Sequence, residues 1–245
     1  MGKPGQLNNC LIENVPIAML YYSNLKTKIF CLILLYSSPT FCQVPVRKEP
    51  RHHIAFENNK IRILNVLINP GDTTLYHIHS TPSFFVCLTK TKTGEQRINS
   101  NPTSGVSIPG QVWFENLSYP HIKMHRVFNL DNSIFHVMDV EILSGDSGFA
   151  RPPIAFEYSK LIVDTPWGRA YKIDLPVKGT ILLPNTSSTL IVVALHSLDL
   201  EENKENLVHF IHLDQGEFIY LSENSNEKLI NNTKVVCHFV VLEIK

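Results

Sequence analysis

The sequence predicts an all-β protein built from two similar sandwich or barrel domains, and three observations support this. Its apolar runs are short and are interrupted by Gly, Pro, Asn and Ser, which is typical of strands joined by turns. Outside residues 29–38, long segments with a helical period are absent from the sequence. The chain also repeats itself once, and a repeat of this length indicates two related domains rather than a solenoid.

The repeat is visible in a tetrapeptide, a turn and a closing strand. The sequence IAFE at Ile54–Glu57 recurs at Ile154–Glu157, and an apolar strand and a glycine turn follow each copy. Gly71 aligns with Gly179 at these turns. The closing runs FHVMDVEI and CHFVVLEI also match, so we expect both halves to share one fold.

Length and composition fit this arrangement. The chain has 245 residues, of which 44% are hydrophobic and 18% charged, so it can bury a substantial core. Its 22 basic residues balance 22 acidic ones, and no basic patch points to nucleic acid as a partner. Turn-forming residues cluster at 145–153. We therefore expect an N-terminal segment at 1–42, a first barrel at 43–147 and a second at 148–245.

The N-terminal segment has the pattern of a targeting sequence. Lys26 and Lys28 precede the apolar run 29–38, which small residues and Cys42 follow. This order is typical of a secretory signal peptide, and the run is short for a transmembrane helix. We therefore expect an exported protein, periplasmic or secreted, that begins near Gln43 and has no membrane span. A buried N-terminal element and lipidation of Cys42 are the alternatives.

Two cysteines, Cys87 and Cys237, lie beyond this segment, each inside an apolar run. They belong to different halves, so the sequence does not establish a disulfide between them. Buried free thiols are the simpler expectation.

The segment Pro70–Leu88 contains the main functional signal. His77 and His79 are two residues apart in an alternating run, so both imidazoles point to the same face of a strand. His125 follows in the sequence HRVFN. Three neutral imidazoles that converge from adjacent strands can bind a divalent metal.

The second half of the repeat lacks these imidazoles. Aligning the glycine turns and the closing strands gives these pairs: Asn185 for His77, Ser187 for His79, Glu227 for His125 and Asn231 for Asn129. A histidine needed only for packing would have a similar residue in both copies. The asymmetry therefore favours a functional role for the three histidines.

These motifs resemble those of the cupin superfamily, in particular its two-domain members, the bicupins. Gly71, five residues and then His77-Ile-His79 resemble the first cupin motif, and His125 with Asn129 resembles the end of the second. The match is incomplete because the inner Pro-x-Gly of the second motif is missing.

The first motif also departs from the usual cupin pattern at one ligand position. Ser83 stands where the motif usually has a glutamate. The first half is similar to small uncharacterised bacterial cupins in which His-x-His is followed by a proline, here Pro82. Thiol dioxygenases resemble this pattern locally, with three histidines on iron.

The resemblance implies two tandem jelly-roll barrels with a metal in the first. One divalent transition metal (Fe, Mn, Zn or Ni) would be bound by His77, His79 and His125. Without the glutamate, this set of ligands is neutral and leaves an additional coordination position open.

Other histidines are weaker candidates. His121 lies four residues before the last of the three and is the first candidate for proton transfer, with a loop histidine as the alternative. His52 and His53 precede the first strand and are expected to face solvent. His209 and His212 are three apart, on opposite faces of a strand, and are not expected to share a metal.

Two functions fit these observations. The first is a metal-dependent enzyme, dioxygenase or isomerase-like, acting on a small organic molecule. The second is a non-catalytic module that binds a small ligand such as a sugar or an aromatic acid. The histidine asymmetry disfavours a purely structural role. A homodimer stays open, and the fold does not identify the substrate because cupin chemistry is diverse.

Overall fold

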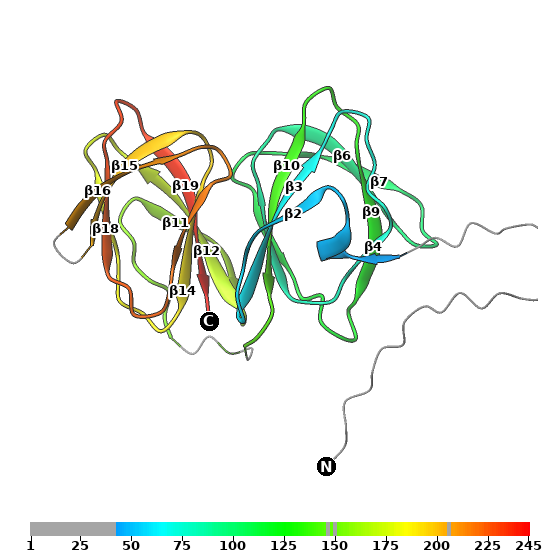
Figure 1. Cartoon of the computed structure of the whole chain (residues 1–245), viewed down its shortest axis with the longest axis horizontal. Helices are drawn as coiled ribbons and strands as arrows, with labels where there is room; N and C mark the ends of the chain where they lie inside the picture. The colour runs from blue at the N-terminus through cyan, green and yellow to red at the C-terminus, as the bar shows by residue number, and fades with distance from the viewer. Residues whose placement is uncertain (1–42, 146–147, 149–150, 205–206) are drawn as a thin grey trace, which may run out of the picture. The chain divides into compact units, whose positions relative to one another are not determined.

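The computed structural model describes residues 43–145, 148, 151–204 and 207–245, and strands dominate these residues (Figure 1). The expected signal segment and Cys42 lie outside the described residues. The first half contains β1 (Val44–Pro45), the 3-10 helix η1 (Val46–Lys48), β2 (His52–Glu57), β3 (Ile61–Ile68), β4 (His77–His79), β5 (Ser83–Cys87), β6 (Thr91–Arg97), β7 (Thr103–Ser107), β8 (Val112–Glu115), β9 (Lys123–Asn129) and β10 (Phe135–Ile142). The second half contains β11 (Ser159–Thr165), β12 (Gly168–Leu175), β13 (Thr180–Leu183), β14 (Thr189–Ala194), β15 (Leu198–Lys204), β16 (Leu207–Leu213), β17 (Phe218–Leu221), β18 (Glu227–Asn231) and β19 (Cys237–Ile244).

The strands form four sheets, two in each half. The strand order is β1-β4-β9-β6-β7 in sheet 1 and β2-β3-β10-β5-β8 in sheet 2. In sheet 3 it is β11-β12-β19-β14-β17, and in sheet 4 it is β13-β18-β15-β16. Apart from β1, the order is the same in the two halves, which confirms an all-β protein with a repeated jelly-roll topology. Sheets 1 and 2 form the first sandwich, sheets 3 and 4 form the second, and neither closes into a continuous barrel in the described part of the chain.

The central strands of sheets 2 and 3 are buried on both faces, which explains their nearly continuous apolar sequences. In β10, Phe135 and Val137 belong to the core cluster of the first sandwich. Met138 and Val140, which point the other way, pack in a second apolar cluster together with Val240 of β19 and other residues of sheet 3. Besides a core of its own, each sandwich therefore contributes to one shared hydrophobic cluster, and the described residues from 43 to 245 lie in one compact unit.

The two halves match at their first hairpins. The pairing of β2 with β3 has a bulge between Ile54 and Phe56, and the pairing of β11 with β12 has the same bulge between Leu161 and Val163. Ile54 thus corresponds to Leu161. The expectation that the IAFE tetrapeptides are equivalent is wrong, because Ile154–Glu157 precedes β11 instead of lying within it.

Two further features occur in both halves. Asn129 Nδ2 donates hydrogen bonds to the carbonyls of Ile68 and of the residue four positions further on, at 2.9 and 2.7 Å. Asn231 Nδ2 donates in the same way to Leu175 and to the residue four positions further on, at 2.9 and 2.8 Å. The sequence alignment of these two asparagines is therefore confirmed.

A buried ion pair is the second repeated feature. Arg62 Nη1 lies 2.7 Å from Glu141 Oε2 across β3 and β10, and Arg169 Nη1 lies 3.6 Å from Glu243 Oε2 across β12 and β19. Because both sandwiches contain this pair, we assign it to the fold rather than to a site.

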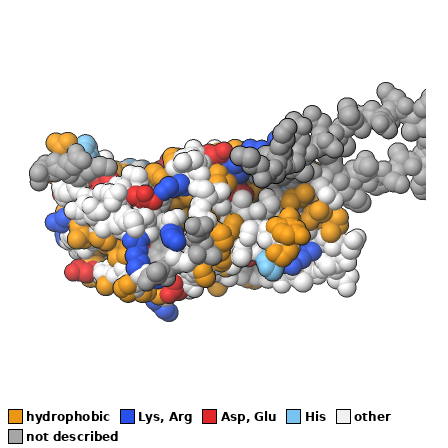
Figure 2. Space-filling view, turned by 90° about the horizontal axis from the view of Figure 1, so that it is seen from below, with side chains coloured by type: hydrophobic (Ala, Val, Ile, Leu, Met, Phe, Trp, Pro, Cys, Tyr) orange, Lys and Arg blue, Asp and Glu red, His pale blue; other side chains and the backbone are white. Residues whose placement is uncertain are grey.

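Cys87 and Cys237 are both buried and free, as expected. Among the described residues, no helix is long and apolar enough to span a membrane. On the face seen in Figure 2, basic, acidic and hydrophobic side chains are interspersed, and Lys and Arg do not gather into one patch.

Candidate metal centre

A cavity of about 200 Å³ lies between sheets 1 and 2 of the first sandwich. Apolar side chains form much of its wall: Val66, Ile68, Phe85, Trp113, Val127, Phe135 and Val137. Its ionisable groups are histidines, three carboxylates and one lysine: His52, His77, His79, His125, Glu95, Glu115, Asp139 and Lys123. An apolar pocket with a few converging polar groups is typical of a small-molecule site.

The structure brings the three expected histidines together in this cavity. In β4, His77 and His79 are 0% and 2% exposed and point inward, as their alternation predicts. The strand β4 pairs with β9 so that His77 lies opposite His125. The ring centroids are 4.6 Å apart for His77 and His125, 5.0 Å for His77 and His79, and 5.1 Å for His79 and His125. His125 thus lies next to His77 and His79, while the described residues whose ligand atoms converge within 4.8 Å are His52, His77 and His79.

His52 also lies in this cavity, which the sequence analysis did not foresee. The expectation that His52 faces solvent is wrong: it is 8% exposed, and its ring centroid is 4.8 Å from that of His77. The ligand atoms of His52, His77 and His79 all lie within 4.8 Å of one another. The burial follows from the pairing of His52 with Val66, a long-range contact that the local sequence does not reveal. His53 is exposed, as expected.

Hydrogen bonds set the orientation of two of the imidazoles. His77 Nδ1 lies 2.9 Å from the carbonyl oxygen of Leu75 and must donate to it, so Nε2 carries the lone pair. His52 Nδ1 lies 2.8 Å from Oε2 of the buried Glu49. In this arrangement the Nε2 atoms are the ligand atoms, and an outer hydrogen bond holds each ring, which is common at metal sites.

Several buried polar atoms around the cavity have no hydrogen-bond partner among the described residues. These atoms are His77 Nε2, His79 Nδ1, both ring nitrogens of His125 and both carboxylate oxygens of Asp139. Orphaned buried polar atoms are costly, and a bound cation would satisfy those that have a free lone pair. The residues therefore fit a divalent transition metal, which imidazole and carboxylate ligands suit.

The electrostatic environment also suits a metal. Burial lowers the pKa of His77 to about 3, and it lowers the pKa values of His79 and His125 below the ordinary value of 6.5. The imidazoles are therefore neutral at neutral pH, and neutral imidazole is the form that binds metals. Burial, together with the Glu141 carboxylate, raises the pKa of Asp139 well above its ordinary value. Asp139 Oδ2 lies 3.6 Å from His79 Nδ1, where it can hold a proton or face a cation.

A lysine and two carboxylates line the cavity beside His125. Lys123 Nζ lies 3.0 Å from Glu95 Oε2 and 3.0 Å from Glu115 Oε1. Burial opposes the ionisation of Glu95, but interactions with His125 and Lys123 prevail and lower its pKa to about 2. The positive charge of Lys123 is thus already compensated by two carboxylates. No sequence motif marks any of these three residues.

The structure does not bring His121 into the cavity. His121 is exposed in the loop before β9, in a separate shallow depression that Arg97 and Leu117 also line. The strand β9 begins only at Lys123, so the alternative of a loop histidine is the correct one for His121. Ser83 is fully buried and pairs with Glu115 and Glu141, but it does not line the cavity.

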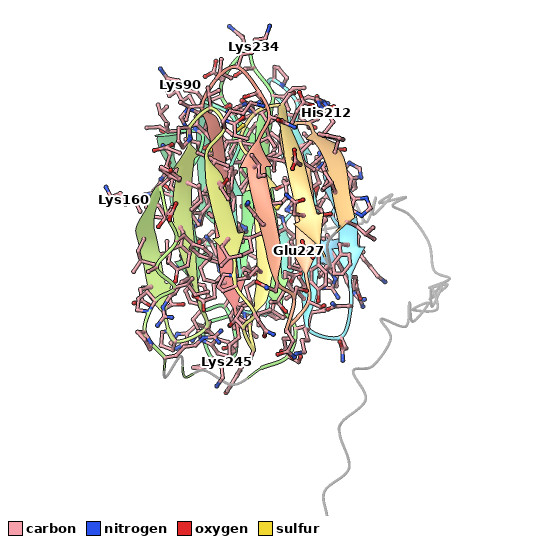
Figure 3. The ribbon with its side chains drawn as sticks, turned by 90° about the vertical axis from the view of Figure 1, so that its left-hand side faces the viewer. Lys90, Lys160, His212, Glu227, Lys234 and Lys245 are labelled. Atoms are coloured by element: carbon pink, nitrogen blue, oxygen red, sulfur yellow. The ribbon has the colours of Figure 1, made fainter. Side chains whose placement is uncertain are left out.

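In the second sandwich, different residues occupy the equivalent positions. Glu227 is four residues before Asn231, as His125 is before Asn129, so the alignment of Glu227 with His125 holds. The residue that pairs with Glu227 is Leu183, and Figure 3 labels Glu227 within this sheet. Leu183 therefore takes the place of His77. The alignment of Asn185 with His77, and with it that of Ser187 with His79, is wrong because both residues lie beyond the end of β13.

The other cavity positions are replaced as well. Register in the first hairpin matches His52 with Ser159, and by the same spacing Glu49 with Phe156. Register in the central strands matches Asp139 with Val241, Phe85 with Val192 and Trp113 with Ile219. Phe156, Leu183, Val192 and Val241 belong to one buried apolar cluster, packed against Ile219. Apolar side chains thus take most of the positions that line the histidine cavity in the first sandwich, and the buried Glu227 takes that of His125.

Comparison with known proteins identifies the fold. No family model and no curated protein sequence matches this chain. Among solved structures, a Cupin 2 conserved barrel domain protein from Leptotrichia buccalis is similar at a TM-score of 0.50 and 10% identity, over 79% of this chain and 88% of that one.

Two similar structures are of enzymes. An oxalate decarboxylase from Lactobacillus farciminis, in complex with formate, matches at a TM-score of 0.55 and 10% identity, over 79% of this chain and 84% of that one. A salicylate 1,2-dioxygenase from Pseudoaminobacter salicylatoxidans matches at 0.52 and 9%, over 76% and 68%. At these identities the likeness shows the fold, which is the cupin fold in a two-domain arrangement.

Proposed function

We propose that this protein is an exported two-domain cupin whose first sandwich binds one divalent transition metal and uses it as an enzyme, as a dioxygenase or isomerase-like catalyst, on a small organic molecule. His77, His79 and His125 would hold the metal, and Fe, Mn, Zn and Ni all suit imidazole ligands. When bound, the metal would polarise the substrate or bind it together with an oxidant.

One observation carries this proposal, namely the contrast between the two sandwiches. The first has buried histidines with unpartnered nitrogen atoms around a cavity of about 200 Å³. At the equivalent positions the second has apolar residues of its buried core, together with the carboxylate of Glu227 in place of His125. The same topology therefore folds without these imidazoles, which supports a functional origin for them in the first sandwich.

The charges in the cavity favour an uncharged substrate. Lys123 is engaged by Glu95 and Glu115, and Asp139 adds a third carboxylate to the lining. A substrate carboxylate would meet these groups without a free cationic partner among the lining residues, so its only strong attraction would be to the metal. The apolar wall that includes Phe85 and Trp113 suits a small, partly apolar molecule.

The carboxylates that line the cavity also bear on proton transfer. His121, the first candidate from sequence, lies outside the cavity and is not positioned to reach a substrate there. Asp139 and Glu95 line the cavity and lie close to ring nitrogens of His79 and His125. We assign them to holding or moving a proton at those ring nitrogens.

Metal analysis combined with turnover tests the proposal. Full-length protein purified without a histidine tag should contain one equivalent of metal, measured by elemental analysis, and His79→Ala should remove it. His212→Ala, which changes an exposed histidine of the second sandwich, is the matched control and should keep the metal. Oxygen consumption or product formation with a panel of small organic molecules should then require the metal. Metal-free wild-type protein would refute the proposal.

A non-catalytic module that binds a small ligand is the alternative. The apolar cavity supports this reading equally well, since a ligand can be recognised without reaction. Ligand binding that persists unchanged after treatment with a chelator would favour the module. Binding and turnover that disappear together with the metal would favour the enzyme.

Export of the protein has its own test. The order of basic, apolar and small residues before Cys42 motivates the proposal. Mass spectrometry of the periplasmic or secreted protein should give a mature chain that begins near Gln43. A mature protein that retains residues 29–38 would contradict export by a cleaved signal.

A further inference from the structure

His52 is buried in the cavity beside the expected metal ligands, and nothing in the proposed function explains its presence there. It is the first residue of β2, a strand whose next three residues are exposed. Its ring centroid lies 4.8 Å from that of His77 and 6.5 Å from that of His79. A buried histidine on an otherwise exposed stretch of strand requires a reason, because burying a polar ring is costly.

The distances suit shared binding of one ion. The ligand atoms of His52, His77 and His79 lie within 4.8 Å of one another. Two imidazole nitrogens on opposite sides of one ion are separated by about 4.2 Å, twice a metal–nitrogen distance of about 2.1 Å. Small changes in side-chain rotation would therefore bring all three nitrogen atoms onto one metal.

Glu49 holds His52 in a ligating orientation. Glu49 is 1% exposed, and its Oε2 lies 2.8 Å from His52 Nδ1. The backbone N–H groups of Arg51 and Leu75 also donate to Glu49, at 2.7 and 3.1 Å, and fix the carboxylate as an acceptor. His52 Nδ1 then donates to Oε2 and leaves the lone pair on Nε2, as in a carboxylate–histidine–metal arrangement.

The same carboxylate is connected to His77. The backbone N–H of Leu75 donates to Glu49 Oε1 at 3.1 Å, and the carbonyl of Leu75 accepts from His77 Nδ1 at 2.9 Å. Glu49 and Leu75 thus orient two imidazoles through one chain of hydrogen bonds. A residue buried only for packing would not need this linkage.

The second sandwich provides an internal comparison. At the positions of His52 and Glu49 it has Ser159 and Phe156. The carboxylate and its histidine are therefore both absent from the sandwich that also lacks His77 and His125. This joint absence groups His52 and Glu49 with the metal ligands.

We propose, on the basis of the proposed metal site, that His52 is a fourth imidazole ligand and that Glu49 is its positioning residue. The site then contains four histidine ligands, and the carboxylate of Glu49 is hydrogen-bonded to one of them, His52. Glu49 is itself paired with Arg51, whose Nη1 lies 3.1 Å from Oε1, so its role is to orient His52 rather than to add net negative charge to the site.

Cobalt titration of the metal-free full-length protein tests this inference. Co²⁺ is the probe, and both its affinity and its visible absorption spectrum are measured. His52→Asn retains a donor toward Glu49 but removes the Nε2 ligand, and it should bind Co²⁺ at least about 10-fold more weakly with a shifted spectrum. Glu49→Gln should weaken binding about 10- to 100-fold with a smaller spectral change. His53→Ala, at the exposed neighbouring residue, is the matched control and should behave as wild type.

The outcomes separate this inference from the proposed function. Wild-type affinity and spectrum in His52→Asn, together with loss of Co²⁺ binding in His77→Ala, would overturn the role of His52 and keep the metal site. Wild-type binding in His77→Ala would overturn both. The Co²⁺-loaded wild-type protein gives a test that needs no variant: four hyperfine-shifted imidazole N–H resonances are expected, and three or fewer would refute a fourth histidine ligand.

Discussion

His77 and Leu183 occupy the same position in the two sandwiches. His77 pairs with His125 on the neighbouring strand, and Leu183 pairs with Glu227. His125 and Glu227 each lie four positions before the repeated asparagine. The backbone thus places an imidazole in one half where it places an isobutyl group in the other. This difference between the two halves, and the contacts around it, lead to the following predictions.

Metal should stabilise the protein through the first sandwich. A ligand that binds only the folded state at 100 times its dissociation constant adds about 2.7 kcal/mol to the free energy of unfolding. Zn²⁺ should therefore raise the melting temperature of the metal-free wild type. His125→Ala should abolish this increase, while His212→Ala should keep it. An equal increase in both variants, measured by scanning calorimetry, would place the metal elsewhere.

Asn129 should stabilise the fold without contributing to metal binding, although it belongs to the same motif as His125. Its amide donates two hydrogen bonds to backbone carbonyls, and Asn231 makes the same two bonds. Asn129→Ala and Asn231→Ala should each lower the free energy of unfolding by about 1–3 kcal/mol, because one buried carbonyl, that of Ile68 or Leu175, loses its donor. Urea denaturation measures the loss. A larger loss of metal in Asn129→Ala than in Asn231→Ala would show that Asn129 takes part directly in metal binding.

Ser83→Glu should destabilise the protein instead of completing the metal site. Ser83 is fully buried, lies between Glu115 and Glu141 in the sheet, and does not line the cavity. A new carboxylate there would be buried beside like charges, so the variant should be about 3 kcal/mol less stable than the neutral Ser83→Gln. Tighter metal binding with unchanged stability in Ser83→Glu would show that the side chain reaches the metal.

The metal-free protein should lose stability in mild acid. Burial lowers the pKa of His77 to about 3 and lowers the pKa values of His79 and His125 below 6.5, so the folded state binds fewer protons than the unfolded state. This contribution to stability is fully present above pH 6.5 and is lost as the pH falls toward 3, by about 1.4 kcal/mol per pH unit for each net proton. The raised pKa of Asp139 acts in the opposite direction and offsets one of these protons.

Chemical denaturation between pH 7 and pH 5 measures this dependence. His77→Leu, which copies the second sandwich, should show a smaller slope than the wild type. A flat stability curve for the metal-free wild type would contradict the prediction.

The sequence predicted the features that depend on local pattern. Alternation placed His77 and His79 on one face, and the spacing of HRVFN matched Asn129 with Asn231. Prediction from sequence failed where the position of a residue depended on the register between strands. The tetrapeptides at Ile54 and Ile154 look alike, but the bulged hairpins match Ile54 with Leu161. A short stretch of identical residues carries no information about which strand it joins.

The same limit applies to the candidate site. His52 stands in a polar stretch, and its burial depends on how β2 pairs with β3. Asp139 stands in the apolar run of β10, where alternation alone does not distinguish the cavity face from the shared core. His121 lies in the loop before β9, which begins two residues later, so strand alternation does not determine where its side chain points. Each of these positions depends on contacts between segments distant in the sequence.

The apolar core shared by sheets 2 and 3 makes each sandwich depend on the other. Met138 of the first sandwich and Val240 of the second pack in this common core, so removing either half would expose an apolar surface to water. The second sandwich, which has Leu183 at the position of His77, therefore supports the first through packing. A gene fragment that encodes the histidine half alone should yield an insoluble product.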